Sequence, residues 1–182
     1  VASRVLGKTA LLEFRTQKEG TFTDLKTLQL QRLKIEEIIK NYLSSEKSQI
    51  DNNFLKIIQD ELKDIEQELN YSSTSSDFYS KLIEIKKYIN KEITNLFIKT
   101  DLSGKDLINA GRRQEQTNSN WEVLLTFSNS GGEKFAEITK SIAGSNQLLA
   151  IILDGESISE ASVGSQFANT GITGGSATIS GN

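Results

Sequence analysis

Four amino acids are missing from this chain. Its 182 residues contain no cysteine, no histidine, no methionine and no proline. Without cysteine and histidine there are no ligands for a typical zinc site, no thiol nucleophile and no base for a serine triad. We therefore expect neither an enzyme nor a bound metal or cofactor. The lack of cysteine also excludes a disulfide, which leaves the cellular compartment open.

An excess of charge of one sign is missing too. The chain carries 21 basic and 24 acidic residues, a formal net charge of -3, and it has no long basic run. Proteins that bind nucleic acid or an anionic membrane surface usually present a basic patch. We expect neither of those partners.

Long apolar runs are absent as well. No stretch approaches the roughly 18 consecutive apolar residues that a membrane-spanning helix needs, so we expect the chain itself to be soluble. It starts at Val1 rather than at a methionine and stops at Asn182 within a patterned segment. We expect it to be a piece of a larger protein.

The first part of the chain predicts one strand and three helices. Apolar and polar residues alternate over Thr9 to Arg15, which places Leu12 and Phe14 on one face of a half-buried strand. From Thr21 on, apolar residues recur at helical spacing in three stretches separated by polar segments. The three sets are Leu25, Leu28, Ile35, Ile39 and Tyr42; Phe54, Ile58, Leu62, Ile65 and Leu69; and Phe78, Leu82, Ile85, Ile89, Ile93 and Leu96. Short connections between them predict an antiparallel arrangement.

After Thr100 the pattern returns to strands and turns. A strand is expected from Trp121 to Phe127, a short helix up to a stop at Gly144, and a buried strand from Leu148 to Leu153 that turns at Asp154-Gly155. The fold class is α+β, a small mixed or antiparallel sheet with one packed helix and a three-helix insertion. We expect residues 1–20 and 101–182 to form an α/β core and residues 21–100 to form a helical insertion.

One segment matches a permissive phosphate-loop pattern, Ala2 to Thr9 with Gly7-Lys8-Thr9 at its end. A phosphate loop needs a strand before it and a helix after it, so that helix N-terminal amides bind the phosphates. We expect no strand before residue 2, and Thr9 opens a strand-like segment where the motif needs a helix. We reject nucleotide binding.

Other candidates for chemistry have simpler explanations. Carboxylates that could pair for acid–base work lie beside glycine or serine in predicted turns, where aspartate favours turn geometry. They are Asp101, Asp106, Asp154 and Glu156. Trp121 opens an alternating strand, so core packing is a better reading than a binding platform.

Glycines gather near the end of the chain. Gly171, Gly174 and Gly175 precede the alternating segment Ala177 to Ile179. Glycine is used where the backbone needs positive φ or close approach. The pattern predicts a sharp corner leading into a terminal strand.

Several of these segments together resemble SecD, a family of accessory subunits of the bacterial Sec protein-translocation machinery. The likeness lies in their letters, order and spacing, and it covers about a hundred residues outside the helical insertion. The segments are Leu6 to Arg15, Thr100 to Leu107, Trp121 to Phe127, Gly131 to Thr139, Ile151 to Ser159 and Gly171 to Ala177. The insertion over 21–100 is longer than in most relatives and is similar to cyanobacterial versions.

The resemblance implies the head of a large extracytoplasmic domain, at the plasma or thylakoid membrane, in a multi-pass protein that works with SecF and the SecYEG channel. It implies contact with unfolded preprotein and hinged motion of the head during export driven by the proton-motive force. Gly7, Gly174 and Gly175 are then candidates for the hinge between head and base, where small residues absorb backbone rotation. The alternative is a structural assembly module that docks another Sec subunit through the helical insertion.

Overall fold

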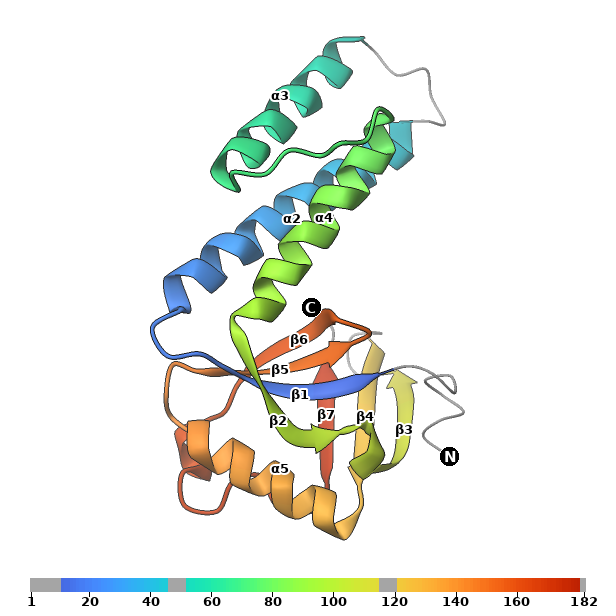
Figure 1. Cartoon of the computed structure of the whole chain (residues 1–182). Helices are drawn as coiled ribbons and strands as arrows, with labels where there is room; N and C mark the ends of the chain where they lie inside the picture. The colour runs from blue at the N-terminus through green and yellow to red at the C-terminus, as the bar shows by residue number, and fades with distance from the viewer. Residues whose placement is uncertain (1–10, 46–51, 115–120, 181–182) are drawn as a thin grey trace. The chain divides into compact units, whose positions relative to one another are not determined.

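The computed structural model describes residues 11–45, 52–114 and 121–180. The chain divides into two compact units, one made of Val1–Phe22 with Thr94–Asn182 and the other of Thr23–Ile93. We call the first the sheet unit and the second the helical unit (Figure 1).

Sheet A of the sheet unit has four antiparallel strands in the order β2-β1-β5-β6. They are β1 (Leu12–Gln17), β2 (Phe97–Ser103), β5 (Leu148–Leu153) and β6 (Glu156–Ser162). The expected turn at Asp154-Gly155 joins β5 to β6, and both residues have positive φ, +51° and +88°. This is the backbone that a tight hairpin turn requires.

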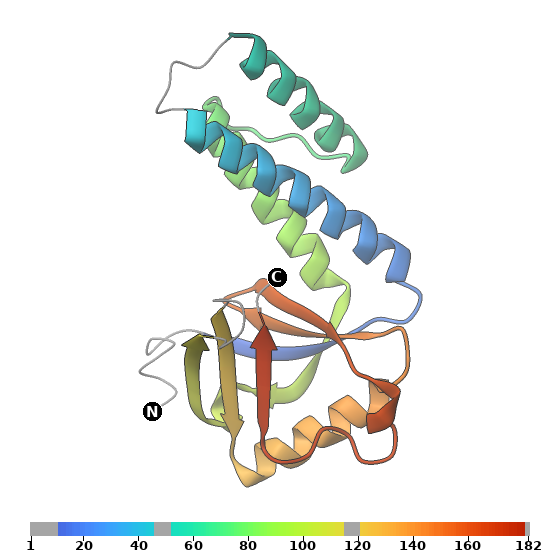
Figure 2. The same ribbon diagram turned by 180° about the vertical axis from the view of Figure 1, so that it is seen from behind.

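Sheet B has three antiparallel strands in the order β3-β4-β7. They are β3 (Leu107–Gln114), β4 (Trp121–Phe127) and β7 (Ser176–Ser180). Figure 2, which views the molecule from behind, shows β7 beside β4. Short 3-10 helices lie at η1 (Gly104–Asp106) and η2 (Ser165–Phe167).

Helix α5 (Asn129–Ile142) follows β4 directly. Ser128 caps its start, because its hydroxyl accepts a hydrogen bond from the Gly131 N–H at 3.0 Å. Gly144 follows its last turn at φ +70°, the left-handed conformation that commonly ends a helix. The stop predicted at Gly144 is confirmed.

The core of the sheet unit joins both sheets and α5. Three aromatic rings meet at its centre: Phe14 of β1 lies 5.7 Å from Phe127 of β4 and 6.4 Å from Phe135 of α5, and the last two rings stack at 4.8 Å. All three side chains are buried. Burying each contributes roughly 1.5–3 kcal/mol. The expectation that Phe14 faces the core is confirmed.

The helical unit contains α2 (Phe22–Ser45), α3 (Asn52–Glu68) and α4 (Phe78–Asn95) at its described positions. Tyr42 near the end of α2 packs on Phe78 at the start of α4, and Glu36 pairs with Lys86 at 2.8 Å, so these two helices run antiparallel. The predicted apolar stripes supply the buried side chains, among them Ile35, Ile58, Leu62, Ile65, Leu82, Ile85 and Ile89.

The helical unit interrupts a β-hairpin. Gln17 at the end of β1 lies opposite Phe97 at the start of β2. One residue further out, the Lys18 N–H donates to the Leu96 carbonyl at 2.9 Å. The two chain segments that lead into and out of the helices are therefore hydrogen-bonded to each other.

The α+β class is confirmed, with the strands divided between two antiparallel sheets. Strand β2 starts at Phe97, before the expected end of the helical insertion at residue 100. The proposal that residues 21–100 form a domain separate from residues 1–20 and 101–182 stays a prediction.

The half-buried character predicted for β1 is wrong at one position. The side chain of Glu13 lies on the face of β1 opposite to the core residues Leu12 and Phe14. Only 4% of Glu13 is nevertheless exposed. Its carboxylate accepts hydrogen bonds from Arg15 and Lys99, which lie on the same face of sheet A. Paired and hydrogen-bonded carboxylates can be buried without prohibitive cost.

Candidate functional site

The glycine corner, residues 171–175, is where the sequence suggested a hinge. The structure gives Gly171, Gly174 and Gly175 φ values of +69°, +101° and +67°, so all three adopt backbone conformations that favour glycine. A Cβ atom on Gly171 would lie 1.8 Å from the Ala136 carbonyl oxygen of α5. Only glycine fits at that contact.

Thr139 of α5 holds the corner in place. Its side chain is 0% exposed, and its hydroxyl donates to the Phe135 carbonyl at 2.7 Å and accepts from the Ile172 N–H at 2.8 Å. Farther along, the Gly175 carbonyl accepts from the Phe127 N–H at 2.8 Å. The corner is thus attached to α5 at one end and to β4 at the other.

The hinge candidates differ in what surrounds them. Gly174 and Gly175 have nothing within 4 Å of the position that a Cβ would take. The space beside these two residues is therefore open to a side chain, whereas at Gly171 it is filled; the Gly175 backbone is itself held by its bond to the Phe127 N–H. Gly7 lies outside the described residues. A hinge role for Gly7, Gly174 and Gly175 remains a proposal.

Asp106 forms a second attachment, between η1 and α5. Its carboxylate accepts from the Ser103 N–H and from the Lys134 ammonium, each at 2.9 Å, and its carbonyl accepts from the Ser128 N–H at 2.8 Å. A Cβ on Gly131 would lie 2.6 Å from that carbonyl oxygen. The start of α5 therefore lies directly against Asp106.

The charge state of Asp106 fits this role. Partial burial opposes its ionisation, but the hydrogen bonds from Lys134 and from the Ser103 N–H outweigh burial and hold the pKa of Asp106 below its ordinary value. The same contact raises the pKa of Lys134. Asp106 is therefore ionised at neutral pH, and its charge holds the Ser103 N–H and the Lys134 ammonium.

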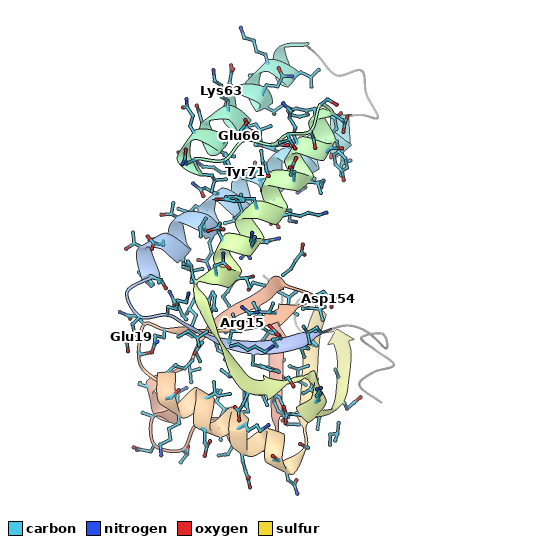
Figure 3. All side chains as sticks on the ribbon, viewed as in Figure 1. Arg15, Glu19, Lys63, Glu66, Tyr71 and Asp154 are labelled. Atoms are coloured by element: carbon cyan, nitrogen blue, oxygen red, sulfur yellow. The ribbon has the colours of Figure 1, made fainter. Side chains whose placement is uncertain are left out.

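Asp154 forms a third attachment, at the β5–β6 turn, where Figure 3 labels it. Its carboxylate accepts from the Leu11 N–H at 2.8 Å, and its own N–H donates to the Leu11 carbonyl at 2.9 Å. These two bonds fix the start of β1 to the hairpin. The described contacts of the Asp154 carboxylate are therefore those of a structural turn residue, as the sequence predicted.

The buried carboxylate of Glu13 is held ionised as well. The hydrogen bond from Lys99 lowers the pKa of Glu13, and the Arg15 guanidinium lowers it further against the opposing effect of burial. Both cations are used in neutralising one acid. Glu13 is thus paired with two cations within sheet A.

Glu84 of α4 organises the loop between α3 and α4 in the helical unit. Its carboxylate accepts from hydroxyls of Tyr71, Ser73 and Ser75. The bonds from Ser73 and Ser75 are the main reason that the pKa of Glu84 falls to about 2. Tyr71, labelled in Figure 3, stacks on Tyr88 at 4.0 Å, and burial together with Glu84 raises its pKa.

Within the described ranges, no three His, Cys, Asp or Glu side chains come together as a possible metal site. Nor is any helix in these ranges long and apolar enough to cross a membrane. The phosphate-loop pattern, Ala2 to Thr9, and the side chain of Trp121 lie outside what the structure describes.

A family model identifies the family to which the chain belongs. The model of the SecDF P1 head subdomain matches residues 81–182. The chain belongs to the SecDF P1 head family. The match begins within α4 and covers the part of the sheet unit from β2 onward, whereas β1 lies outside it.

Two curated relatives extend the match to the helical unit. The chain is 51% identical over 181 residues to the protein translocase subunit SecD of Prochlorococcus marinus and 37% identical over 181 residues to that of Synechocystis. All of this chain aligns with 37% and 33% of their lengths, so it spans about a third of each relative.

A solved structure agrees in fold. It is that of SecDF, described as a membrane component that enhances protein export, with a TM-score of 0.50 and 23% identity. The likeness covers 95% of this chain and 56% of that one.

The residues that carry the family resemblance are the ones that hold the sheet unit together. The segment 100–107 supplies Asp106, the segment 131–139 supplies Gly131 and Thr139, and the glycine corner packs on both α5 and β4. Sequence reasoning did not assign a role to Thr139 or to Glu84. The available signal for Thr139 was its place in the segment Gly131 to Thr139, which carries the family resemblance, while the sequence marked Glu84 only as one of several charged residues expected on a solvated helix face.

Proposed function

We propose that this chain is the head of the extracytoplasmic domain of a preprotein translocase accessory subunit. In this proposal it is a non-enzymatic body that contacts unfolded polypeptide during export. The observation that carries the proposal is the family match over residues 81–182, which covers most of the sheet unit. The contacts of Asp106, Thr139 and Asp154, which lie in the segments that carry the family resemblance, hold the sheet unit together. Such structural roles support the proposal of a non-enzymatic body.

In the same proposal the sheet unit moves as a rigid head. Its attachments resist internal deformation, so rotation concentrates at the junction glycines; of these, Gly174 has open space at its Cβ position, whereas the Gly175 carbonyl is bonded to the Phe127 N–H. The proton-motive force would drive this motion through other parts of the protein, together with SecF and the SecYEG channel. The head would lie at the extracytoplasmic face of the plasma or thylakoid membrane.

Site-specific cross-linking tests the contact. Single cysteines are placed at exposed positions of the sheet unit in the full-length protein, such as Lys105, Glu137 and Asn169, and a preprotein is arrested during export. The chain lacks native cysteine, so each label is unique within it. Cross-links to the preprotein are expected from the head. Uniform failure beside positive channel controls would reject the contact.

A second candidate function is docking of another Sec subunit through the helical unit. The observation that favours it is an apolar surface on α2, where Leu30 and Leu33 are 53% and 61% exposed. Contiguous exposed apolar patches mark association surfaces, and these two leucines lie one helical turn apart.

Replacing residues 23–93 of the full-length protein with a short Gly/Ser bridge separates the two candidates. This replacement retains Thr94, whose hydroxyl donates a hydrogen bond to the Gly155 carbonyl at 3.1 Å. It also retains the buried Phe97. Export retained with loss of subunit association would favour docking. Preprotein cross-links retained with association intact would favour the head alone.

A further inference from the structure

The sheet unit has four edge strands, β2 and β6 in sheet A and β3 and β7 in sheet B. An edge strand presents backbone N–H and C=O groups to which another extended chain can pair. Proteins usually protect such edges with charged side chains or with β-bulges. The four edges of this unit differ in that protection.

Three of the edges are protected. The pairing register shifts at Ile158 of β6, at Ile108 of β3, and between Lys99 and Ser103 of β2. All three strands also carry charged residues, which are Lys99 and Asp101, Arg112 and Arg113, and Glu156 and Glu160. An extended chain cannot pair along the whole of any of these strands without a break in register, and on β3 the stretch beyond the bulge carries Arg112 and Arg113.

Strand β7 has neither device. It pairs with β4 in unbroken register from Thr126 opposite Ser176 to Glu122 opposite Ser180. Its sequence, Ser-Ala-Thr-Ile-Ser, contains no charged residue and no proline. Among the strands that the structure describes, none pairs with its outer edge.

The alternation of hydrogen bonds defines what this edge presents. The Phe127 N–H donates to the Gly175 carbonyl, so Leu125 and Ala177 form the next bonded pair of the antiparallel ladder. The N–H and C=O of Ser176 and Thr178, which fall between these pairs, therefore point away from β4. Both residues are exposed.

We propose that the outer edge of β7 binds an extended segment of unfolded polypeptide by adding it to sheet B as a further strand. This inference rests on the proposed function and names the surface that performs it. Unfolded chains of different sequence share only their main chain, and alternating backbone donors and acceptors recognise that main chain. An edge without charged side chains does not select among sequences.

Photo-cross-linking from three positions of the full-length protein tests the surface. Benzoylphenylalanine replaces Thr178 of β7 or, as matched controls on protected edges, Ile108 or Ile158, which are 56% and 49% exposed. Two arrested preproteins of unrelated sequence are used. Strong cross-links from position 178 to both preproteins, and weak ones from positions 108 and 158, are expected.

Two substitutions at residue 178 distinguish binding through its backbone N–H from binding through its side chain. Thr178→Pro removes the outward N–H and leaves the bonds to β4, a position where an edge strand accepts proline. Thr178→Val keeps the N–H. We expect Thr178→Pro to lower the yield of cross-links from a cysteine at Ser176 about five-fold, the effect of losing one backbone hydrogen bond, and Thr178→Val to leave it unchanged. If Thr178→Pro fails to fold, the comparison of positions 178, 108 and 158 decides alone.

The outcomes distinguish this inference from the proposed function. Cross-links from position 108 or 158 but not from 178 overturn the β7 surface and leave head contact standing. Cross-links from position 178 to another segment of the same protein also overturn it, because the edge is then already paired. No cross-link from any head position, beside positive channel controls, removes both proposals.

Discussion

Gly171 is the residue with least freedom to change. Alanine there would combine positive φ with a Cβ 1.8 Å from the Ala136 carbonyl oxygen. We expect Gly171→Ala to lower the free energy of unfolding by about 3 kcal/mol or more. Gly20→Ala is the matched control, since Gly20 has φ +77° with nothing within 4 Å, and strain alone costs about 1 kcal/mol there. Urea unfolding measures both; equal losses would contradict the close contact.

Thr139 gives a prediction about a single hydroxyl. Thr139→Val keeps the shape but leaves the partly buried Ile172 N–H without its acceptor, and an unsatisfied donor of this kind costs about 1 kcal/mol. Thr139→Ser keeps the hydroxyl and is expected to cost less. Urea unfolding gives the free energies, and hydrogen exchange at the Ile172 amide is expected to accelerate only in the valine variant. Unchanged exchange there would contradict the attachment.

Glu84 predicts an acid-sensitive helical unit. Its pKa falls from an ordinary 4.5 to about 2 because hydroxyls of the α3–α4 loop bind its ionised form. That stability is therefore complete above the ordinary pKa and is lost as the pH falls from about 5 to 2. Thermal unfolding followed by circular dichroism across this range is expected to show a shallower acid dependence in Glu84→Gln than in wild type. Identical slopes would contradict the role of Glu84.

At the scale of elements, the hairpin formed by β1 and β2 predicts that the sheet unit tolerates loss of the helices. Residues on either side of the insertion are already bonded, Lys18 to Leu96 and Gln17 opposite Phe97. With residues 23–93 replaced by a Gly/Ser bridge, we expect cooperative unfolding, with a melting temperature lowered by less than about 10 °C. Differential scanning calorimetry checks this. Loss of a cooperative transition would show that the two units fold together.

Helices and tight turns were predictable because their signals are local. The stripe through Leu82, Ile85 and Ile89 has the helical period, and Asp154-Gly155 needs only adjacent residues to specify a turn. The division into two sheets was not predictable, since it depends on pairings such as that of β1 with β5, far apart in sequence.

In the candidate site, too, local features were predictable from the sequence and long-range contacts were not. Glycine spacing predicted the corner at Gly171 to Gly175, whereas its attachment to Thr139 depends on tertiary packing. Glu13 was misread because alternation says nothing about the cations that surround a carboxylate. Local pattern locates a site, and only the fold supplies its partners.

At the scale of the whole molecule, the hinge proposal depends on the two glycines with open surroundings. In the full-length protein, Gly174→Ala is expected to slow preprotein export several-fold, because a side chain restricts rotation there. The strain at φ +101° costs only about 1–2 kcal/mol, so the melting temperature is expected to fall less than in Gly171→Ala. Export assays in membrane vesicles and thermal unfolding measure the two effects. Export at the wild-type rate would contradict the hinge.

We propose above all that the sheet unit binds unfolded polypeptide and that this binding involves no catalytic step. Equilibrium binding to the full-length protein tests this most directly. The ligands are a fluorescent polypeptide that cannot fold and its folding-competent parent. Each is titrated against the wild-type protein and against the variant in which residues 23–93 are replaced. We expect the protein to bind the unfolded form alone, and to bind it equally well after the helical unit is replaced. Equal binding of both forms, or binding that disappears with the helical unit, would contradict it.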